Sequence, residues 1–593
     1  MARVQIRRPG HAGQPGRRDA GAVSGNRWLV LAIVLTAVFM QLLDVTVTTV
    51  AVPSIQRSLH ATFGEVQLVL AGYSLAFACV LITGGRLGDI YGRKRLFLIG
   101  MVTFTVASAI CGAAPDAMTL VIARIVQGVC SGLMFPQVLA ILQVTFPDRD
   151  KQKAFAAYGA SIGLATILGP VLGGALIKLN LFGTDWRSIF YINVPIGLVA
   201  LAAGIKYVGE STAPHADRLD LPGVAAVTTG LFLLVLPLVI GRDQGWPAWS
   251  LVMLACSAPV LAGFTWYEWA LTRRAGKSPL MRTTLFRQRS FSVGLVVCLV
   301  FFAGIPSFFF VFLLTLQVGF SYQPVSAGAV TLAFAVMVAV ASARSAAVVK
   351  RLGTWTLLVG CVLLAIGMAG VAWQLHWAGT GLHGYQLSPS LIVAGTGAGL
   401  VLAPLTSVIL AGVRSTDAGA ASGVLATAQQ VGAAAGIAIV GILFFGQLAT
   451  NASSAASAAV PALHTRLATA GLPGSAADQV VAGFRVCFHD HASQNDPTAV
   501  PASCRRIQRR VAAAPAPTAV KDAVVTAVTG RAIPLARKDD FTRSLQHALL
   551  FWQIPAFLLT GLLVFALPKV KPSSTAPAEP ERTPLQPTPS ERS

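Results

Sequence analysis

Charged residues are scarce in this chain of 593 residues. Only 11% of the residues are Asp, Glu, Lys or Arg, whereas 54% are apolar, and a soluble domain carries about 25% charged residues. So few charges cannot cover the surface of a soluble protein, but lipid can solvate the outside of a membrane protein. The composition therefore argues against a set of soluble domains and indicates an integral membrane protein.

Several motifs are missing as well. The sequence contains no nucleotide-binding motif, which argues against direct ATP coupling, and no motif of a cofactor site, so we expect no cofactor. Six of the eight cysteines lie inside apolar runs without the spacing of a zinc site, and we interpret them as small apolar fillers. The net charge of +22 sits in short clusters between apolar runs, not on one amphipathic face, so we expect no nucleic-acid partner.

Long apolar runs are abundant, and about 20 residues are needed to cross a bilayer as a helix. The sequence predicts an all-α membrane protein with fourteen spans, at roughly 28–50, 66–85, 96–113, 118–142, 154–178, 189–208, 222–241, 249–269, 291–314, 326–343, 354–377, 389–412, 418–446 and 543–567.

Basic residues alternate between the connections of these spans. If the N-terminus is cytoplasmic, the Lys- and Arg-rich connections 86–95, 147–153, 272–290 and 344–351 are cytoplasmic too, as the positive-inside rule requires. The tail 1–27 and the Pro- and Ser-rich tail 568–593 are then both cytoplasmic. The Ala-, Ser- and Pro-rich segment 447–542 becomes a long outer loop with weak helical stretches.

The end of the second span resembles a transporter signature. Its sequence GGRLGDIYGRKR, from Gly84 to Arg95, resembles the loop 2–3 signature of the major facilitator superfamily. Asp89, Gly92, Arg93 and Lys94 fall at its characteristic positions. A positive-inside loop with a stray acidic residue is the alternative interpretation of this segment alone.

Further motifs occur in the order of that superfamily. RIVQGVCSG in the fourth span and LATILGPVLGG in the fifth resemble its helix 4 and antiporter helix 5 signatures, although Ala165 stands where the family usually has Gly. The segments LDVTVTTVAVP, DWRSIFYINVPIG and AGAASGVLATAQQVGAAAG resemble the fourteen-helix drug:proton antiporter subfamily. The resemblance covers residues 28 to about 446 and the last span.

The resemblance implies a domain organisation. We expect two six-helix halves, 28–208 and 291–567, with two additional helices inserted at 222–269. The halves rock about a central site that opens to one side of the membrane at a time. Asp89 is expected to dock on the N-terminus of the thirteenth helix, around Ala418 to Ala420, and to latch the outward-open state together with Gly92, Arg93 and Lys94.

Asp44 is the one acidic residue that we place well inside a span, about 6 Å from its middle. Burial in lipid disfavours a charged carboxylate, which suits a group that gains and loses a proton, although a structural helix cap is the alternative. Arg124 lies at a comparable depth in the fourth span. Gln127, with Gly128 and Ser131, continues a polar stripe from Arg124 that faces a cavity or serves as packing.

Other candidate residues concern packing and the substrate. Gly169, Pro170, Gly173 and Gly174 predict a tight seam between the halves near the outer side. Phe301 and Phe309 belong to an aromatic run that suits large apolar or cationic ligands, or that faces lipid. The full set of candidate cavity residues is Gln41, Thr48, Gln127, Ser131, Phe301, Phe309, Gln429 and Gln430.

The remaining cysteines, Cys487 and Cys504, share the long outer segment. A disulfide is the simpler interpretation of such a pair outside the cytoplasm. A metal site with His489 and His491 is the alternative, and we expect none.

These features predict a multi-pass cell-membrane protein that exports amphipathic, in some cases cationic, drugs or antibiotics in exchange for protons. An importer or exporter of a metabolite or osmolyte is the rival with the same fold, which the helix 5 signature disfavours by resemblance. A membrane-embedded enzyme needs several acids or a histidine cluster at one depth, and no such constellation is present, so we expect no catalytic residues.

Overall fold

The computed structural model describes residues 27–180, 183–212, 219–241, 244–273, 279–472, 474–492, 501–513 and 517–568. Of the two predicted tails, 1–27 and 568–593, only residues 27 and 568 fall within the described part. Every regular element within it is helical, as predicted. The first helices are α1 (Arg27–Ser58), α2 (Phe63–Tyr91), α3 (Arg93–Ala113), α4 (Ala117–Thr145), α5 (Asp148–Leu179), α6 (Ser188–Tyr191) and α7 (Asn193–Tyr207).

Two helices follow as a pair, and the rest form a second series. The pair is α8 (Leu221–Ile240) and α9 (Ala248–Thr272). The second series is α10 (Arg289–Leu314), α11 (Pro324–Leu352), α12 (Trp355–Ala378), α13 (Ser388–Leu410), α14 (Ala418–Thr469), α15 (Gly474–Ala492), α16 (Ala502–Ala513), α17 (Thr518–Ala527), α18 (Ile533–Ala548) and α19 (Ile554–Val564).

Thirteen helical stretches of the described part are long and apolar enough to cross a membrane. The remaining predicted span, 154–178, lies in α5, a helix of 32 residues that packs against α1 and α11. Together these helices account for the fourteen predicted spans. Their backbone groups bond within each helix, which is what a bilayer without water demands.

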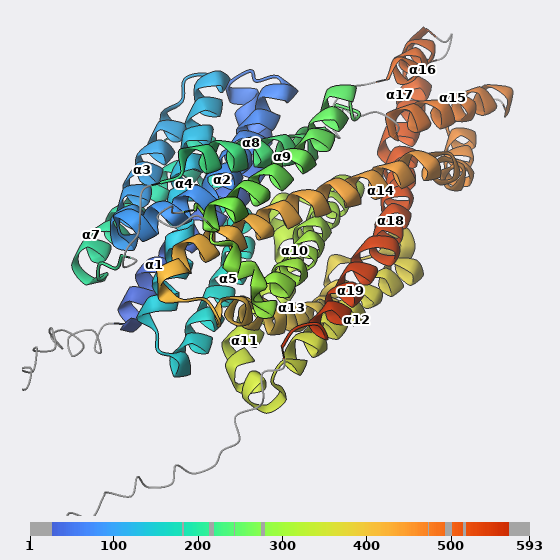
Figure 1. The fold of residues 1–593 in the computed structure, drawn as a ribbon. Coiled ribbons are helices and arrows are strands. Elements are labelled where there is room, and N and C mark those ends of the chain that lie inside the picture. Colours follow the sequence, from blue (N-terminus) through green and yellow to red (C-terminus); the bar gives the residue numbers. More distant parts are fainter. Residues whose placement is uncertain are drawn as a thin grey trace, which may run out of the picture.

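The helices pack as two groups (Figure 1). In the first, α2 and α3 pack on α4, while α1 packs on α5 and α7. In the second, α11 and α12 pack on α13, while α14 and α19 pack on α10. The most extensive contacts between the groups are those of α5 with α11 and of α2 with α14, and α5 with α13 and α4 with α14 add smaller ones. The inserted pair α8 and α9 lies on the outside of the junction of α2 with α14, where α8 contacts both helices.

The described part of the segment 447–542 differs from its prediction in extent, because it is helical almost throughout and not only in weak stretches. α14 continues without a break to Thr469 and has 52 residues, about 78 Å at ~1.5 Å per residue, more than twice the ~30 Å of a hydrocarbon core. Its far half therefore lies beyond the membrane. It is joined there by α15, α16 and α17, and α17 leads through α18 into α19.

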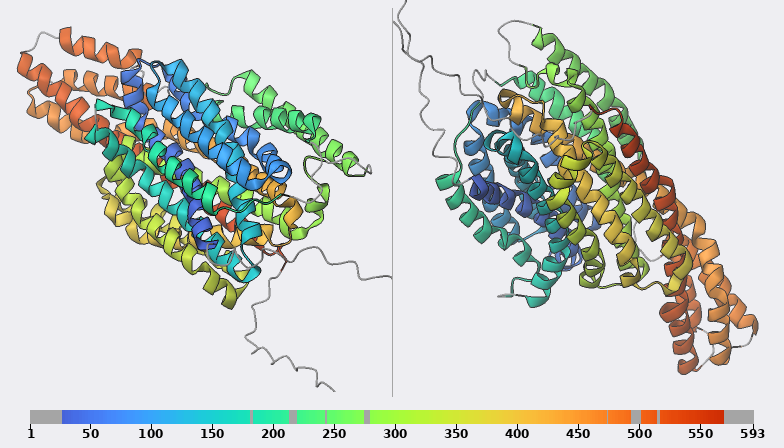
Figure 2. Two further views of the ribbon diagram at one scale, coloured as in Figure 1. Left: turned by 90° about the vertical axis from the view of Figure 1, so that its left-hand side faces the viewer. Right: turned by 90° about the horizontal axis from the view of Figure 1, so that it is seen from below.

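This projecting part, which we call the protrusion (residues 447–542), extends well beyond the other helices (Figure 2). It has a small core of its own, in which Ala452, Ala455, Ala456 and Ala459 of α14 meet Phe484 of α15. These alanines recur at a spacing of three and four residues, which places them on one helix face. The helical period of these alanines is present in the sequence. Because small residues are abundant throughout the segment, the buried face contrasts little with the exposed one, and the segment resembles a loop.

A disulfide joins Cys487 of α15 to Cys504 of α16, across a sequence separation of 17 residues. It ties together two helices between which the chain passes through residues 493–500, outside the described part. The disulfide is the one covalent constraint among the described residues of the protrusion.

We expect mass spectrometry of unreduced peptides to find Cys487 and Cys504 linked. Replacing both by Ser removes a loop closure that is worth about 3 kcal/mol in the chain-entropy model. Amide hydrogen exchange should therefore become faster in α15 and α16 but not in α2 or α13. Cys256→Ser, at an exposed unpaired cysteine of α9, is the matched control. Two free thiols in protein isolated without reductant contradict the pairing.

Candidate functional site

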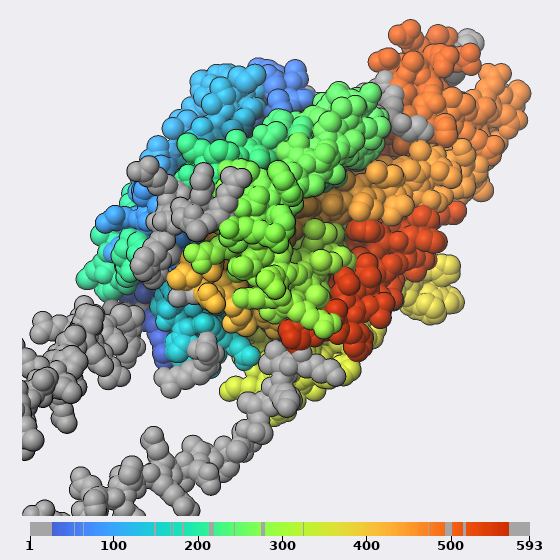
Figure 3. Space-filling model, viewed as in Figure 1, coloured from blue at the N-terminus to red at the C-terminus, as the bar shows by residue number. Residues whose placement is uncertain are grey.

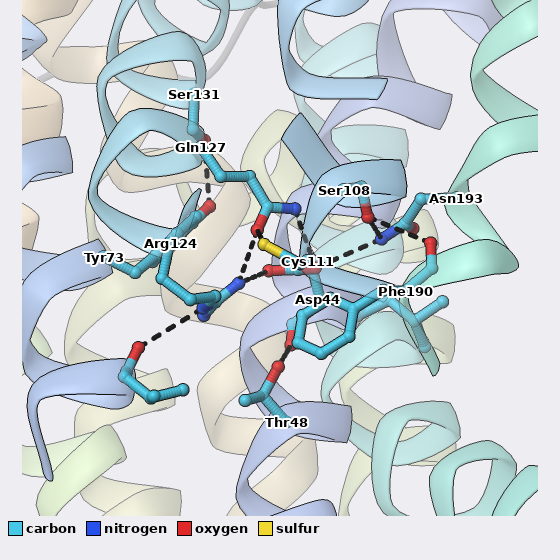
Figure 4. A network of polar contacts seen from close by, with 12 residues as sticks. Asp44, Thr48, Tyr73, Ser108, Cys111, Arg124, Gln127, Ser131, Phe190 and Asn193 are labelled. Atoms are coloured by element: carbon cyan, nitrogen blue, oxygen red, sulfur yellow. Dashed lines mark hydrogen bonds and ion pairs between the residues drawn. The ribbon is translucent and has the colours of Figure 1, made fainter. Parts of the chain in front are cut away.

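The centre of the first helix group holds a buried ion pair (Figure 4). Asp44 of α1 is 2% exposed and Arg124 of α4 is 1% exposed. Arg124 Nη1 donates a hydrogen bond to Asp44 Oδ2. Both residues lie inside helices that cross the membrane, so each charge is compensated by the other and not by water.

Two amide side chains complete the surroundings of Asp44. Gln127 Nε2 and Asn193 Nδ2 donate to Asp44 Oδ1 over 3.0 and 3.1 Å. Asn193 begins α7 and also donates to Ser108 Oγ of α3 over 3.0 Å. Ser108 in turn donates to the carbonyl of Phe190 over 2.9 Å. The carboxylate thus joins α1 directly to α4 and α7, and α3 contributes through the Asn193–Ser108 bond. A displacement of α1, α4 or α7 changes its hydrogen bonds.

Arg124 has several partners besides Asp44. Its Nη1 donates to Gln127 Oε1 over 2.8 Å, and its Nε donates to the carbonyl of Val69 in α2 over 3.3 Å. Its guanidinium carbon lies 4.2 Å from the ring centre of Tyr73, a cation–π distance. The guanidinium is therefore stabilised by α2 on one side and by the carboxylate on the other.

The candidate cavity residues of the first group belong to this packed network. Thr48 Oγ1 donates to the backbone carbonyl of Asp44 over 2.6 Å, and Ser131 accepts from the Tyr73 hydroxyl over 3.0 Å. Gln127 holds the ion pair, and Gln41 is 4% exposed. In this conformation these four side chains are buried among protein atoms, and their role in lining a substrate cavity stays a prediction.

The candidate cavity residues of the second group are also packed. Phe301 is buried with its ring against Phe557 of α19, and Phe309 meets Phe334 of α11 edge to face. The aromatic run thus fills the spaces between α10, α11 and α19. Gln429 is buried in α14, and Gln430 is half-buried beside it.

A second buried carboxylate lies where α2 crosses the start of α14, at the opposite end of α14 from the protrusion. The amides of Gly419 and Ala420 donate to Asp89 Oδ1 and Oδ2 over 3.0 and 2.9 Å. Arg93 Nη2 lies 2.7 Å from Asp89 Oδ1. The first amides of a helix have no partner within it and attract an anion, so Asp89 joins the two helix groups by an anion–helix contact.

The neighbours of Asp89 have different tasks. Gly92 has a φ of +107° between α2 and α3, a conformation that favours glycine. Lys94 Nζ donates to the carbonyl of Ile205 in α7 over 2.8 Å, so it contacts the first helix group and not the second. The carboxylate of Glu210, which sequence reasoning missed, accepts from the amides of Lys94 and Arg95. Asp89 is thus the predicted latch residue whose bonds to α14 are described.

The seam predicted along α5 runs on two sides of the helix. Gly169 and Gly173 face Thr46 and Val47 of α1, within the first group, and not the other half as predicted. Gly174 faces Val325 of α11 across the two groups. Gly163, earlier in α5, faces Val338 of the same helix α11. Pro170 lies within α5, at a position whose side chain is outside the described atoms.

Comparison with known proteins decides the family. The model of the Major Facilitator Superfamily matches residues 34–437, which is more than half of the chain. The chain belongs to the major facilitator superfamily. It is therefore a multi-pass membrane transporter of small molecules and not an enzyme.

Relatives in the superfamily are similar over most of the chain. The probable actinorhodin transporter of Streptomyces coelicolor is 38% identical, over 91% of this chain and 92% of that protein. The tetracenomycin C resistance and export protein of Streptomyces glaucescens is 34% identical, over 72% of this chain and 77% of its own. Among solved structures, the human organic anion transporter MFSD10 shares the fold, with a TM-score of 0.51 at 16% identity, over 70% of this chain and 94% of its own.

Sequence reasoning missed several residues of the network around Asp44 and Arg124. Asn193 lies within the motif DWRSIFYINVPIG, and its amide inside an apolar helix was the available signal. Tyr73 and Ser108 gave no such signal, because single hydroxyls are common in membrane helices. Asp44 is also not the only buried acid within a candidate span, since Glu268 is fully buried and Asp540 is 1% exposed.

We expect Asp89→Asn to lower transport while leaving the amount of protein in the membrane unchanged. The substitution keeps the shape but removes the charge that accepts from Gly419 and Ala420, and charge-assisted hydrogen bonds of this kind are worth about 1.5–3 kcal/mol, roughly tenfold or more in an equilibrium. Energised efflux of a fluorescent dye from cells measures the change. Asp116→Asn, at an exposed cap of α4, is the control, and wild-type efflux by Asp89→Asn shows that the contact is dispensable.

Proposed function

We propose that this transporter exports amphipathic drugs or antibiotics and that protons entering the cell drive the export. The cargo is inferred from the printed names of its relatives, one a probable transporter of actinorhodin and another an export and resistance protein for tetracenomycin C. The coupling is inferred from the buried Asp44–Arg124 pair. This pair is the observation that carries the proposal.

An ion pair inside the membrane suits coupling for a physical reason. A buried carboxylate is stable only while it is paired or protonated. In the present conformation Asp44 receives hydrogen bonds from Arg124, Gln127 and Asn193. When α1 moves relative to α4 and α7, Asp44 loses donors and takes up a proton. The proton is released when the helices return, which ties proton movement to the change of conformation.

Two other buried acids compete for this role. Glu268 of α9 accepts from the amide of Met281 over 2.8 Å, and Asp540 lies in α18 next to Asp539. Both lie outside the first helix group, and no arginine bonds to Glu268 among the described contacts. Asp44 is favoured because three helices of one group, α1, α4 and α7, meet at its carboxylate. Glu268→Gln and Asp540→Asn therefore serve as comparison variants.

In the proposed orientation both termini are cytoplasmic and the protrusion is outside the cell. The Asp89 contact then closes the cytoplasmic ends of α2 and α14, so that it acts as a latch of the outward-open state. An importer of a metabolite is the rival function within the same fold, and only transport assays separate the two.

We expect Asp44→Asn to abolish accumulation of substrate against a gradient in inside-out vesicles with an imposed pH difference, because Asn cannot titrate. Downhill exchange of substrate should persist, which shows that the variant folds. Since loss of one partner of a buried pair costs about 3–5 kcal/mol, the neutral double variant D44N/R124Q is tested beside it. Glu268→Gln should still pump. Uphill transport by Asp44→Asn places the coupling elsewhere.

We expect reporter fusions at Ala470 and Lys571 to lie on opposite sides of the membrane. Ala470 follows the far end of α14, whereas Lys571 follows the last span. Alkaline phosphatase should be active at Ala470 only, and green fluorescent protein at Lys571 only. The same pattern at both sites contradicts the proposed topology.

A further inference from the structure

The protrusion contains a cleft between α15, α16 and α17 with a volume of about 790 Å³. This volume falls within the 300–1,000 Å³ of typical small-molecule sites. Much of its wall is aliphatic, from residues that include Val480, Ile507 and Val511. The cleft is remote from the Asp44 network, and the space-filling view shows the protrusion projecting at one end of the molecule (Figure 3).

The charged residues that line the cleft are all basic. They are Arg506 and Arg510 of α16 and Lys521 of α17. The two arginines are four residues apart and so lie on one helix face, where like charges repel. Lys521 Nζ donates to the carbonyl of Ala512 over 2.7 Å, which fixes the lysine beside α16. Three cations around an apolar cleft make it attractive to an anion that carries an apolar body.

A buried hydroxyl supports the presence of a ligand. Ser503 lines the cleft, is 5% exposed, and its Oγ has no hydrogen-bond partner in the described part of the chain. Leaving a buried hydroxyl without a hydrogen-bond partner is unfavourable. An oxygen acceptor on a ligand satisfies it. The adjacent Cys504 is tied to Cys487, so the wall that carries Ser503 is held in place before binding.

We propose that this cleft binds an amphipathic organic anion, with its carboxylate or sulfonate near Arg506 and Arg510 and its apolar part against the valines and Ile507. Such an anion has two sources, an exported aromatic acid or a fatty acid from the membrane, and the shared chemistry is a single anionic group on an apolar body. The site is distinct from the transport pathway proposed above.

The probe is 8-anilinonaphthalene-1-sulfonate, added to the full chain in nanodiscs of phosphatidylcholine, with empty nanodiscs subtracted. We expect saturable fluorescence from the wild type and an increase in Kd of at least about tenfold, or ~1.4 kcal/mol, for R506Q/R510Q. The variant removes both arginine charges, and hydrogen bonds to charged groups are stronger than those between neutral groups. The matched control is R505Q/R509Q, which removes two exposed arginines of the same helix that do not line the cleft. Its Kd should stay within about twofold, a change of only ~0.4 kcal/mol.

Three further arms complete the test. Dansylcadaverine, an amphipathic cation, should not compete with the probe. Displacement by oleate but not by 1-naphthoate assigns a lipid-derived ligand, and the reverse assigns an aromatic acid. Ser substitution of both Cys487 and Cys504 should weaken binding, whereas Asp44→Asn should not, so this site and the proposed transport function fail independently. Three results overturn the proposal. They are an equal loss of probe affinity in R506Q/R510Q and R505Q/R509Q, no loss of affinity in R506Q/R510Q, and competition with the probe by dansylcadaverine.

Discussion

The structure depends on compensating one pair of charges inside a bilayer that offers no water. An isolated Asp44 or Arg124 at this depth costs several kcal/mol, and each is the other's partner. Because Gln127 and Asn193 add donors to the same carboxylate, the compensation depends on the positions of three helices, α1, α4 and α7, at once. A transporter that changes conformation must rearrange this site, and a proton is a simple replacement for a lost donor.

The two helix groups meet through close contacts between small residues and one anionic contact. Gly85 of α2 lies against the backbone of Gly419 in α14, where a side chain on either residue collides with the opposite helix. This close approach brings Asp89 within reach of the first amides of α14. The packing and the electrostatic contact are therefore coupled, since a wider crossing separates the carboxylate from the amides.

The protrusion follows a different physical rule from the membrane helices. Outside the bilayer its helices are held by a small alanine-rich core and a disulfide, because a few short helices bury little apolar surface. Its cleft combines apolar walls with basic side chains. Water can solvate these basic side chains, whereas lipid cannot. The part of the chain that least resembles the family signatures thus carries a candidate site of its own.

The sequence by itself determined the class of the protein, the number of spans and the family, because lipid imposes a hydropathy pattern that can be counted along the chain. It also singled out Asp44, Arg124 and Asp89, since charges are rare within or beside such runs. Only the tertiary structure decided which side chains meet. Asn193 and Asp44 are 149 residues apart, and local pattern does not encode that contact. Which helix each α5 glycine faces depended on the helices that pack beside α5. The helices in the described part of 447–542 were not evident from the sequence, because an alanine-rich helix face has little contrast in hydropathy.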